Sequence, residues 1–166
     1  MHNNNLFKRS FRKNVMANIL LTGVSGVTGR TGVNVLGYLD KLVSPEDDVS
    51  VLQHEHPVDL SLTRGRKRTS LISSLPNSKE YDVAIHFAAN IHTSKGRDPS
   101  KYHEFKRDNI DLTRRVCASA FYVLHASTDC VFSGNGAGQY KESDIPDSTN
   151  YYGATKAIAE EIVGAH

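Results

Sequence analysis

The sequence lacks tryptophan, contains only two cysteines, and has no long apolar run. Cys117 and Cys130 are too few for a disulfide framework and are typical of a reducing compartment. No stretch approaches the roughly 20 apolar residues that span a bilayer, and the N-terminus lacks the apolar segment of a secretory signal. These absences predict a soluble, cytoplasmic protein with no membrane partner.

Neither sign of charge dominates, because 20 Lys and Arg stand against 18 Asp and Glu, for a formal net charge of +2. The chain therefore lacks the strong positive field that non-specific nucleic-acid binding uses, and no nucleic-acid partner is expected. Its 166 residues are 39% hydrophobic and 23% charged, as in an ordinary globular domain. This length leaves little room for a second domain.

The first 17 residues are basic and contain no acidic side chain. This composition fits either an Arg-rich transit segment or a poorly ordered tail. We expect a tail over residues 1–17 and a single folded domain over residues 18–166.

From Asn18 onward the hydrophobic pattern alternates between strands and helices. Apolar runs predict strands at 19–21, 49–52, 81–89 and 121–126, with a less regular strand near 58–62. Helical spacing predicts helices over 27–42, 101–119 and 152–165. This alternation predicts an α/β fold built on a doubly wound parallel sheet.

A glycine-rich turn follows the first predicted strand and opens the first predicted helix. Gly23, Gly26 and Gly29 have a GxxGxxG spacing. Glycine permits a tight turn and lets backbone N–H groups approach a pyrophosphate at the helix N-terminus. In this strand–turn–helix context, the spacing predicts a dinucleotide-binding Rossmann fold.

The pattern leaves the choice between NAD and NADP open. An acid that binds the adenine ribose is expected about 20 residues after the turn, and only Asp47 and Asp48 stand there, before the second predicted strand. The basic segment 64–68 suits a solvated loop, a site for the 2′-phosphate of NADP, or nucleic acid. The predicted cofactor is therefore NAD or NADP.

Tyr152 and Lys156 stand four residues apart at the start of the last predicted helix, so their side chains share a face. A phenol has a pKa near 10, and a nearby ammonium lowers that pKa. Tyr152 would then exchange a proton with a carbonyl or an alcohol while a nicotinamide exchanges a hydride.

Five motifs occur in the order found in extended short-chain dehydrogenases/reductases. They are the turn 22–29, the strand end 86–89 and the segments 127–134, 140–146 and 152–156. The chain therefore resembles the NAD-dependent epimerase/dehydratase group of that superfamily.

This resemblance implies a role for each matching residue. Thr128 matches the catalytic Ser or Thr at the reacting oxygen, and Tyr152 matches the acid/base. Lys156 matches the residue that binds the nicotinamide ribose and lowers the pKa of the tyrosine. Cofactor contacts are implied for Gly23, Gly26, Val27, Gly29, Asp59, Ala88 and Ala89. The implied partner is a nucleotide-linked 4-keto sugar, with a homodimer as the candidate assembly.

Lys156 is followed by only 10 residues, where family members continue with a sixth strand and a smaller substrate-binding region. Three hypotheses follow from this difference. The chain is an NAD(P)-dependent reductase or epimerase, a non-catalytic NAD(P)-binding regulatory subunit, or an incomplete enzyme fragment. No metal site is expected, since the cluster at 54–56 lacks the spacing of a zinc site.

Overall fold

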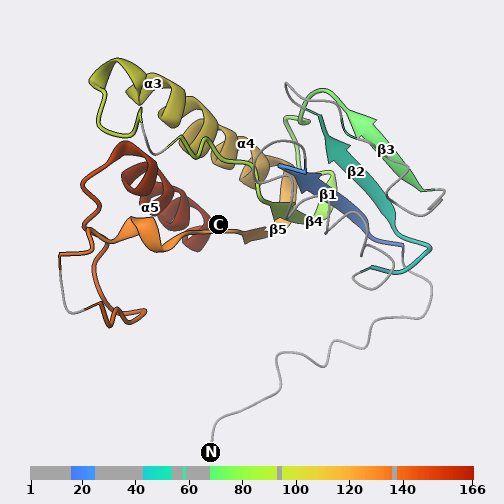
Figure 1. The fold of residues 1–166 in the computed structure, drawn as a ribbon. Helices are drawn as coiled ribbons and strands as arrows, with labels where there is room; N and C mark the ends of the chain where they lie inside the picture. The colour runs from blue at the N-terminus through green and yellow to red at the C-terminus, as the bar shows by residue number, and fades with distance from the viewer. Residues whose placement is uncertain (1–15, 25–42, 54–57, 59–67, 93–94, 136–137) are drawn as a thin grey trace, which may run out of the picture.

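The computed structural model describes residues 16–24, 43–53, 58, 68–92, 95–135 and 138–166. Its strands are β1 (Asn18–Thr22), β2 (Asp48–Leu52), β3 (Thr69–Ile72), β4 (Tyr81–His86) and β5 (Ala120–His125). They form one five-stranded sheet in the order β3-β2-β1-β4-β5, and every pairing is parallel. This topology confirms the predicted doubly wound parallel sheet (Figure 1).

The described helices lie on the side of the sheet near β4 and β5. One continuous helix comprises α3 (Tyr102–Phe105), the π-helical segment η4 (Lys106–Asp111) and α4 (Leu112–Ser119). Two short 3₁₀ helices, η3 (Pro99–Lys101) and η5 (Asp129–Val131), precede α3 and α5 (Tyr151–Gly164). α4 packs on β4 and β5, while α5 packs on α4, η4 and η5 (Figure 1). The predicted helix over 27–42 lies outside the described residues.

Both faces of the central strand are buried. Successive side chains of a strand point to opposite faces, and in β1 Ile19 and Leu21 join one apolar cluster while Leu20 joins the other. Val116 of α4 belongs to the same cluster as Leu20. A strand buried on two faces reads as a continuous apolar run, which is why the sequence locates β1 so clearly.

The third strand differs from the expectation. It comprises residues 69–72, whereas the pattern predicted a strand near 58–62. Val58 belongs to no strand, and residues 59–62 lie outside the described part of the chain. β3 is an edge strand whose residues are exposed or half-buried, so it carries little of the apolar signal that marks a central strand.

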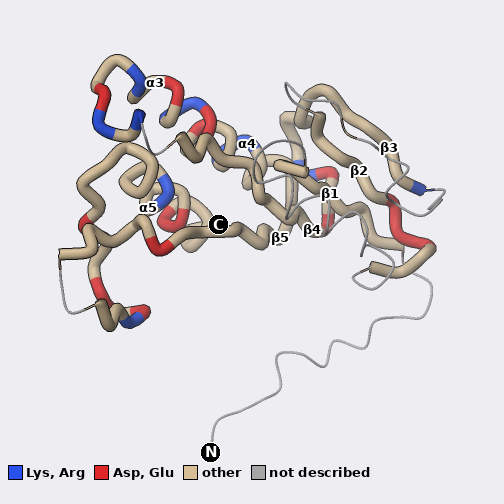
Figure 2. The backbone as a smooth tube through the Cα atoms, viewed as in Figure 1, with Lys and Arg blue, Asp and Glu red and all other residues tan. Residues whose placement is uncertain are grey.

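Charges of both signs alternate on the surface of α3 and η4 (Figure 2). Ion pairs join Lys101 to Glu104 at 2.7 Å and Lys106 to Asp111 at 2.7 Å. The described helices thus offer no face of a single sign at this place. None of them combines the length and the apolar character that crossing a membrane requires.

Candidate functional site

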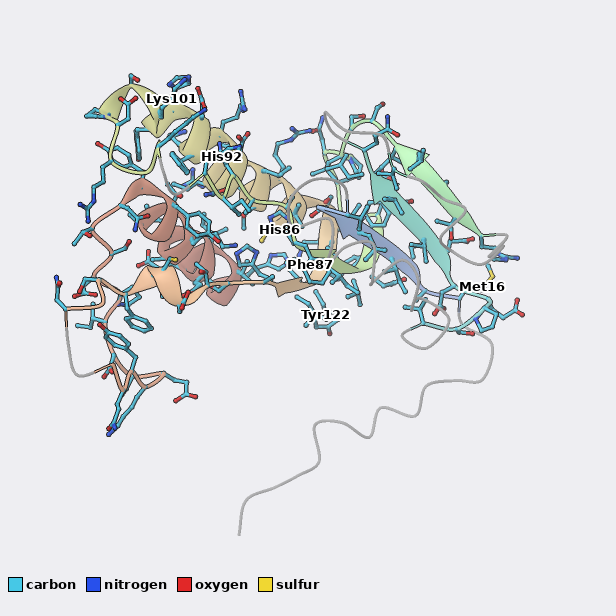
Figure 3. The ribbon with its side chains drawn as sticks, viewed as in Figure 1. Met16, His86, Phe87, His92, Lys101 and Tyr122 are labelled. Atoms are coloured by element: carbon cyan, nitrogen blue, oxygen red, sulfur yellow. The ribbon has the colours of Figure 1, made fainter. Side chains whose placement is uncertain are left out.

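Loops that follow three neighbouring strands meet at one edge of the sheet. β1 and β4 are adjacent in the sheet. The strand after β1 is β2, on one side of this pair, and the strand after β4 is β5, on the other side. Open α/β sheets bind ligands at such a switch point, outside the carboxyl ends of the strands. Gly23 follows β1, Ala88 and Ala89 follow β4, and Thr128 follows β5. Figure 3 labels His86, the last residue of β4, in the middle of the molecule.

Gly23 lets the turn after β1 approach the end of β4 closely. Its φ is 76°, a conformation that glycine adopts without steric cost, and a Cβ there would overlap the backbone nitrogen of Ala88. The carbonyl oxygen of Thr22 accepts the N–H of Phe87 at 3.1 Å, and its hydroxyl accepts the N–H of Ala88 at 3.4 Å. Other predicted cofactor residues lie outside the described part of the chain, namely Gly26, Val27, Gly29 and Asp59.

The start of α5 is packed tightly against η5. A Cβ on Gly153 would overlap the carbonyl oxygen of Cys130, so glycine is what allows the helix to approach this close. Thr128 caps η5 by accepting the N–H of Cys130 at 3.2 Å. The same side chain acts on the phenol of Tyr152, whose pKa it lowers. Two of the predicted catalytic residues therefore lie together.

Asn150 caps α5, since its Oδ1 accepts the N–H of Gly153 at 2.9 Å. We expect Asn150→Ala to lower the free energy of unfolding by about 1 kcal/mol, because an orphan N–H of the first turn loses its acceptor. Urea denaturation monitored by circular dichroism measures this change. Asn150→Ser, which keeps a capping oxygen, is the control and should lie close to the unmodified chain. An alanine variant of unchanged stability would contradict the role of the cap.

Lys156 lies one turn beyond Tyr152 on α5 and is only 2% exposed. Its Nζ donates to the carbonyl oxygen of Ala126 at 2.6 Å and lies 2.7 Å from Nε2 of His125. Burial lowers the pKa of Lys156 to about 8, and the nearby charge of Glu160 opposes that shift. The amine is thus held at the carboxyl end of β5, at the same edge as Gly23.

The pKa of Tyr152 differs from the expectation that an adjacent amine lowers it. Burial of the phenol raises this pKa, and the hydrogen bond with Thr128 opposes the shift. The amine of Lys156 is directed toward Ala126 and His125. Without bound ligand, Tyr152 is therefore a protonated phenol at neutral pH.

His86 is a fully buried histidine with both ring nitrogens hydrogen-bonded, as expected from its place in an apolar strand. Nε2 lies 3.0 Å from the hydroxyl of Thr113, which donates its own proton to the carbonyl oxygen of Asn109 at 2.6 Å. Nε2 must therefore donate to Thr113, and Nδ1 accepts from the hydroxyl of Thr22 at 2.6 Å. Burial first, and then the nearby His125 and Lys156, lower the pKa of His86 to about 3.

This buried neutral histidine makes the folded state sensitive to acid. Below pH 6.5 the unfolded chain binds a proton at His86 that the folded chain does not bind until about pH 3. The free energy of unfolding therefore decreases as the pH is lowered through that window. We expect His86 to account for about 2 kcal/mol of lost stability between about pH 7.5 and about pH 5. Urea unfolding at the two pH values measures this loss. His86→Asn, which cannot titrate, should show a loss smaller by that amount, and an equal loss would contradict the assignment.

Asn109, which the sequence pattern did not mark as a site residue, joins two parts of the site. Its side chain accepts the N–H of Asn90 at 2.6 Å and donates to Thr155 Oγ1 at 2.9 Å. Asn109 is 1% exposed and lies in η4, and π-helical turns are frequent at functional sites. It connects the loop after β4 to α5 beside Lys156. An asparagine inside a helical pattern, where it is a poor helix former, was the available signal.

The basic segment 64–68 and the cluster at 54–56 lie away from this site or outside the described residues, whereas Cys130 lies at the site beside Gly153. Arg68 precedes β3, at the amino edge of the sheet, and forms an exposed ion pair with Asp48 at 3.3 Å, so it does not face the carboxyl edge. No group of His, Cys, Asp or Glu in the described part of the chain is arranged to hold a metal ion. The cluster at 54–56 is outside that part, and the two cysteines are free.

The fold and the site together define a class of nucleotide-binding protein, with a doubly wound parallel sheet, a glycine turn at its switch point and a Tyr–Lys pair on a nearby helix. The model of the NAD dependent epimerase/dehydratase family matches residues 19–166. The chain belongs to this family, as its five ordered motifs predict.

Relatives in the family carry different names. The chain is 29% identical over 150 residues to dTDP-4-dehydrorhamnose reductase of Aggregatibacter actinomycetemcomitans, covering 89% of this chain and 47% of that protein. It is 24% identical over 155 residues to methionine adenosyltransferase 2 subunit beta of Bos taurus, covering 87% of this chain and 42% of the relative. The chain thus spans about half the length of the curated relatives it matches.

A solved structure supports the fold. UDP-glucuronic acid 4-epimerase from Bacillus cereus, solved in complex with NAD, superposes with a TM-score of 0.64 at 23% sequence identity. The match covers 89% of this chain and 51% of the epimerase. At this identity the similarity shows a shared Rossmann fold.

Proposed function

We propose that the chain is the cofactor-binding part of an NAD(P)-dependent reductase or epimerase that acts on a nucleotide-linked 4-keto sugar. The observation that carries this proposal is that Thr128 acts on Tyr152, with Lys156 one turn further along α5, at the sheet edge that also carries the Gly23 turn. Its supports are membership of the family and the names of the relatives, which include a dehydrorhamnose reductase and a UDP-sugar epimerase.

The described residues fit a dinucleotide at this edge. The turn at Gly23 brings the backbone close to Ala88, and the buried Lys156 places an amine with a spare N–H at the end of β5. In this proposal Gly23, Gly26, Val27 and Gly29 line the pyrophosphate, Ala88 and Ala89 line the cofactor, and Asp59 lies near the adenine. A nicotinamide supplies hydride transfer when it is bound.

The three side chains would then divide the proton chemistry. Tyr152, protonated at neutral pH, would give its proton to a carbonyl oxygen that receives a hydride on carbon, and it would take the proton back in the reverse direction. Thr128 would hold that oxygen through its hydroxyl. Lys156 would bind the nicotinamide ribose with its remaining N–H, and its ammonium would favour the phenolate form of Tyr152.

Fluorescence titration of the full chain with NADH and with NADPH tests the cofactor part of the proposal and distinguishes the two cofactors. Consumption of the reduced cofactor with a dTDP-linked 4-keto sugar tests the reaction. Binding of either cofactor with a dissociation constant in the micromolar range is expected. The absence of binding to both would overturn the proposal.

A second function is a non-catalytic NAD(P)-binding subunit. It is supported by the similarity to a protein named as a subunit of methionine adenosyltransferase. Cofactor binding without turnover is expected in this case, and also if the catalytic unit requires more chain than the sequence given. A fusion of the chain to the unmatched half of a dehydrorhamnose reductase separates these two cases. A catalytic unit that requires more chain would gain turnover in the fusion, whereas a non-catalytic subunit would not.

A further inference from the structure

The hydrogen bonding of the half-buried His125 differs from that of the buried His86. Both ring nitrogens of His86 are hydrogen-bonded to threonine hydroxyls, as expected for a histidine with a purely structural role in the core. In His125, Nε2 lies 2.7 Å from Nζ of Lys156, while Nδ1 is buried without a hydrogen-bond partner among the described residues. The hydrogen bonding of this ring in the described structure is therefore directed at Lys156 alone.

The protonation states fix the direction of this contact. Burial, followed by the charge of Lys156, lowers the pKa of His125 to about 4, so the ring is neutral at physiological pH. The ammonium of Lys156 has three protons and no acceptor capacity. Nε2 must therefore accept, and the unpartnered Nδ1 carries the ring proton. A buried N–H without a partner is costly, which indicates that the ring orientation is set by the bond to the amine.

The contact restricts where Lys156 can point. Ala126 O takes one of its N–H groups at 2.6 Å, and His125 Nε2 takes a second. These two acceptors, one on the backbone and one on the last side chain of β5, leave a single N–H for a ligand. A lysine with one acceptor would rotate more freely, because its stem has four rotatable bonds.

We propose that His125 is a positioning residue, which holds the Lys156 amine charged and aims its remaining N–H at the cofactor ribose. The statement about the ribose rests on the proposed function, whereas the statement about the amine does not. Among the described residues, the other titratable groups that act on this amine are Glu160 on α5 and His86 on β4, whose ring centroid lies 5.0 Å from that of His125.

Two substitutions separate hydrogen bonding from packing. His125→Phe keeps a ring but removes the acceptor, while His125→Gln can place an amide oxygen near the position of Nε2. NMR titration of the lysine Cε and Nζ signals in the full chain without cofactor measures the pKa of Lys156, with Lys156→Met identifying its signal. We expect this pKa to fall by about one unit in the Phe variant, a tenfold change in the protonation constant, and to return in the Gln variant.

Cofactor titration supplies the second readout. Near pH 8 we expect NADH or NADPH to bind about fivefold more weakly to the Phe variant, because the charged fraction of the amine falls from about one half to about one tenth. Binding to the Gln variant should be almost normal. An unchanged Lys156 pKa in the Phe variant would overturn the proposal, and an equal fall in both variants would assign the effect to ring packing instead. A parent chain that binds neither cofactor would overturn the proposed function, while the NMR titration would still decide the role of His125.

Discussion

In the proposed reductase or epimerase, Tyr152→Phe is expected to lower turnover of a 4-keto sugar nucleotide by about 10²–10⁴-fold, the usual contribution of a positioned general acid. The substitution removes one oxygen and leaves Lys156, His125 and the Gly23 turn in place. The dissociation constant of the cofactor should therefore stay within about twofold of its original value. Rates of NADPH or NADH consumption and fluorescence titrations measure the two quantities.

The neighbouring tyrosine provides a matched control. Tyr151 begins the same helix, but its ring packs against Tyr102 with centroids 5.2 Å apart. Tyr151→Phe removes the same oxygen one residue away, so it should retain turnover. Retained turnover in Tyr152→Phe would rule out this residue as the acid/base. Equal losses in both variants would indicate an effect on helix packing rather than on proton transfer.

The strands of the fold were predictable from the sequence where burial requires apolar residues. Predicted apolar runs overlap β1, β2, β4 and β5. Of these, β5 is an edge strand that leaves Phe121, Tyr122 and Leu124 exposed, so burial does not explain its apolar run. The inner strands β1, β2 and β4 are apolar because most of their side chains are covered. The edge strand β3 has no such requirement, and its composition did not distinguish it from a loop. The helix over 152–165 was also predicted closely, since the segment is rich in Ala, Ile and Glu, and it is observed over Tyr151–Gly164.

The site was predictable as a set of residues but not as an electrostatic environment. Helical spacing places Tyr152 and Lys156 on one face, and the motifs point to Thr128 as their neighbour. The direction of the lysine amine depends on how α5 packs against β5, which brings His125 and Ala126 within reach. The raised pKa of Tyr152 likewise results from burial by chain distant in sequence, so local pattern pointed to the opposite shift.

Gly23→Ala is expected to destabilise the fold by about 2–5 kcal/mol. A left-handed backbone costs a residue with a Cβ about 1–2 kcal/mol, and overpacking at the Ala88 backbone adds about 1–3 kcal/mol. Gly134 has the same φ of 76°, yet a Cβ there would meet nothing within 4 Å. Gly134→Ala therefore reports the backbone cost alone and should lose only about 1–2 kcal/mol.

Urea unfolding of the two variants isolates the packing between β1 and β4, because their difference cancels the shared conformational cost. The Gly23 variant should also bind NADH or NADPH more weakly, since any relief of the overlap must move either the turn or the strand end at Ala88. The Gly134 variant should bind the cofactor normally. Equal losses of stability in both would mean that the turn can move away from β4 freely. In that case, the close approach of these two loops would not be what shapes the cofactor edge.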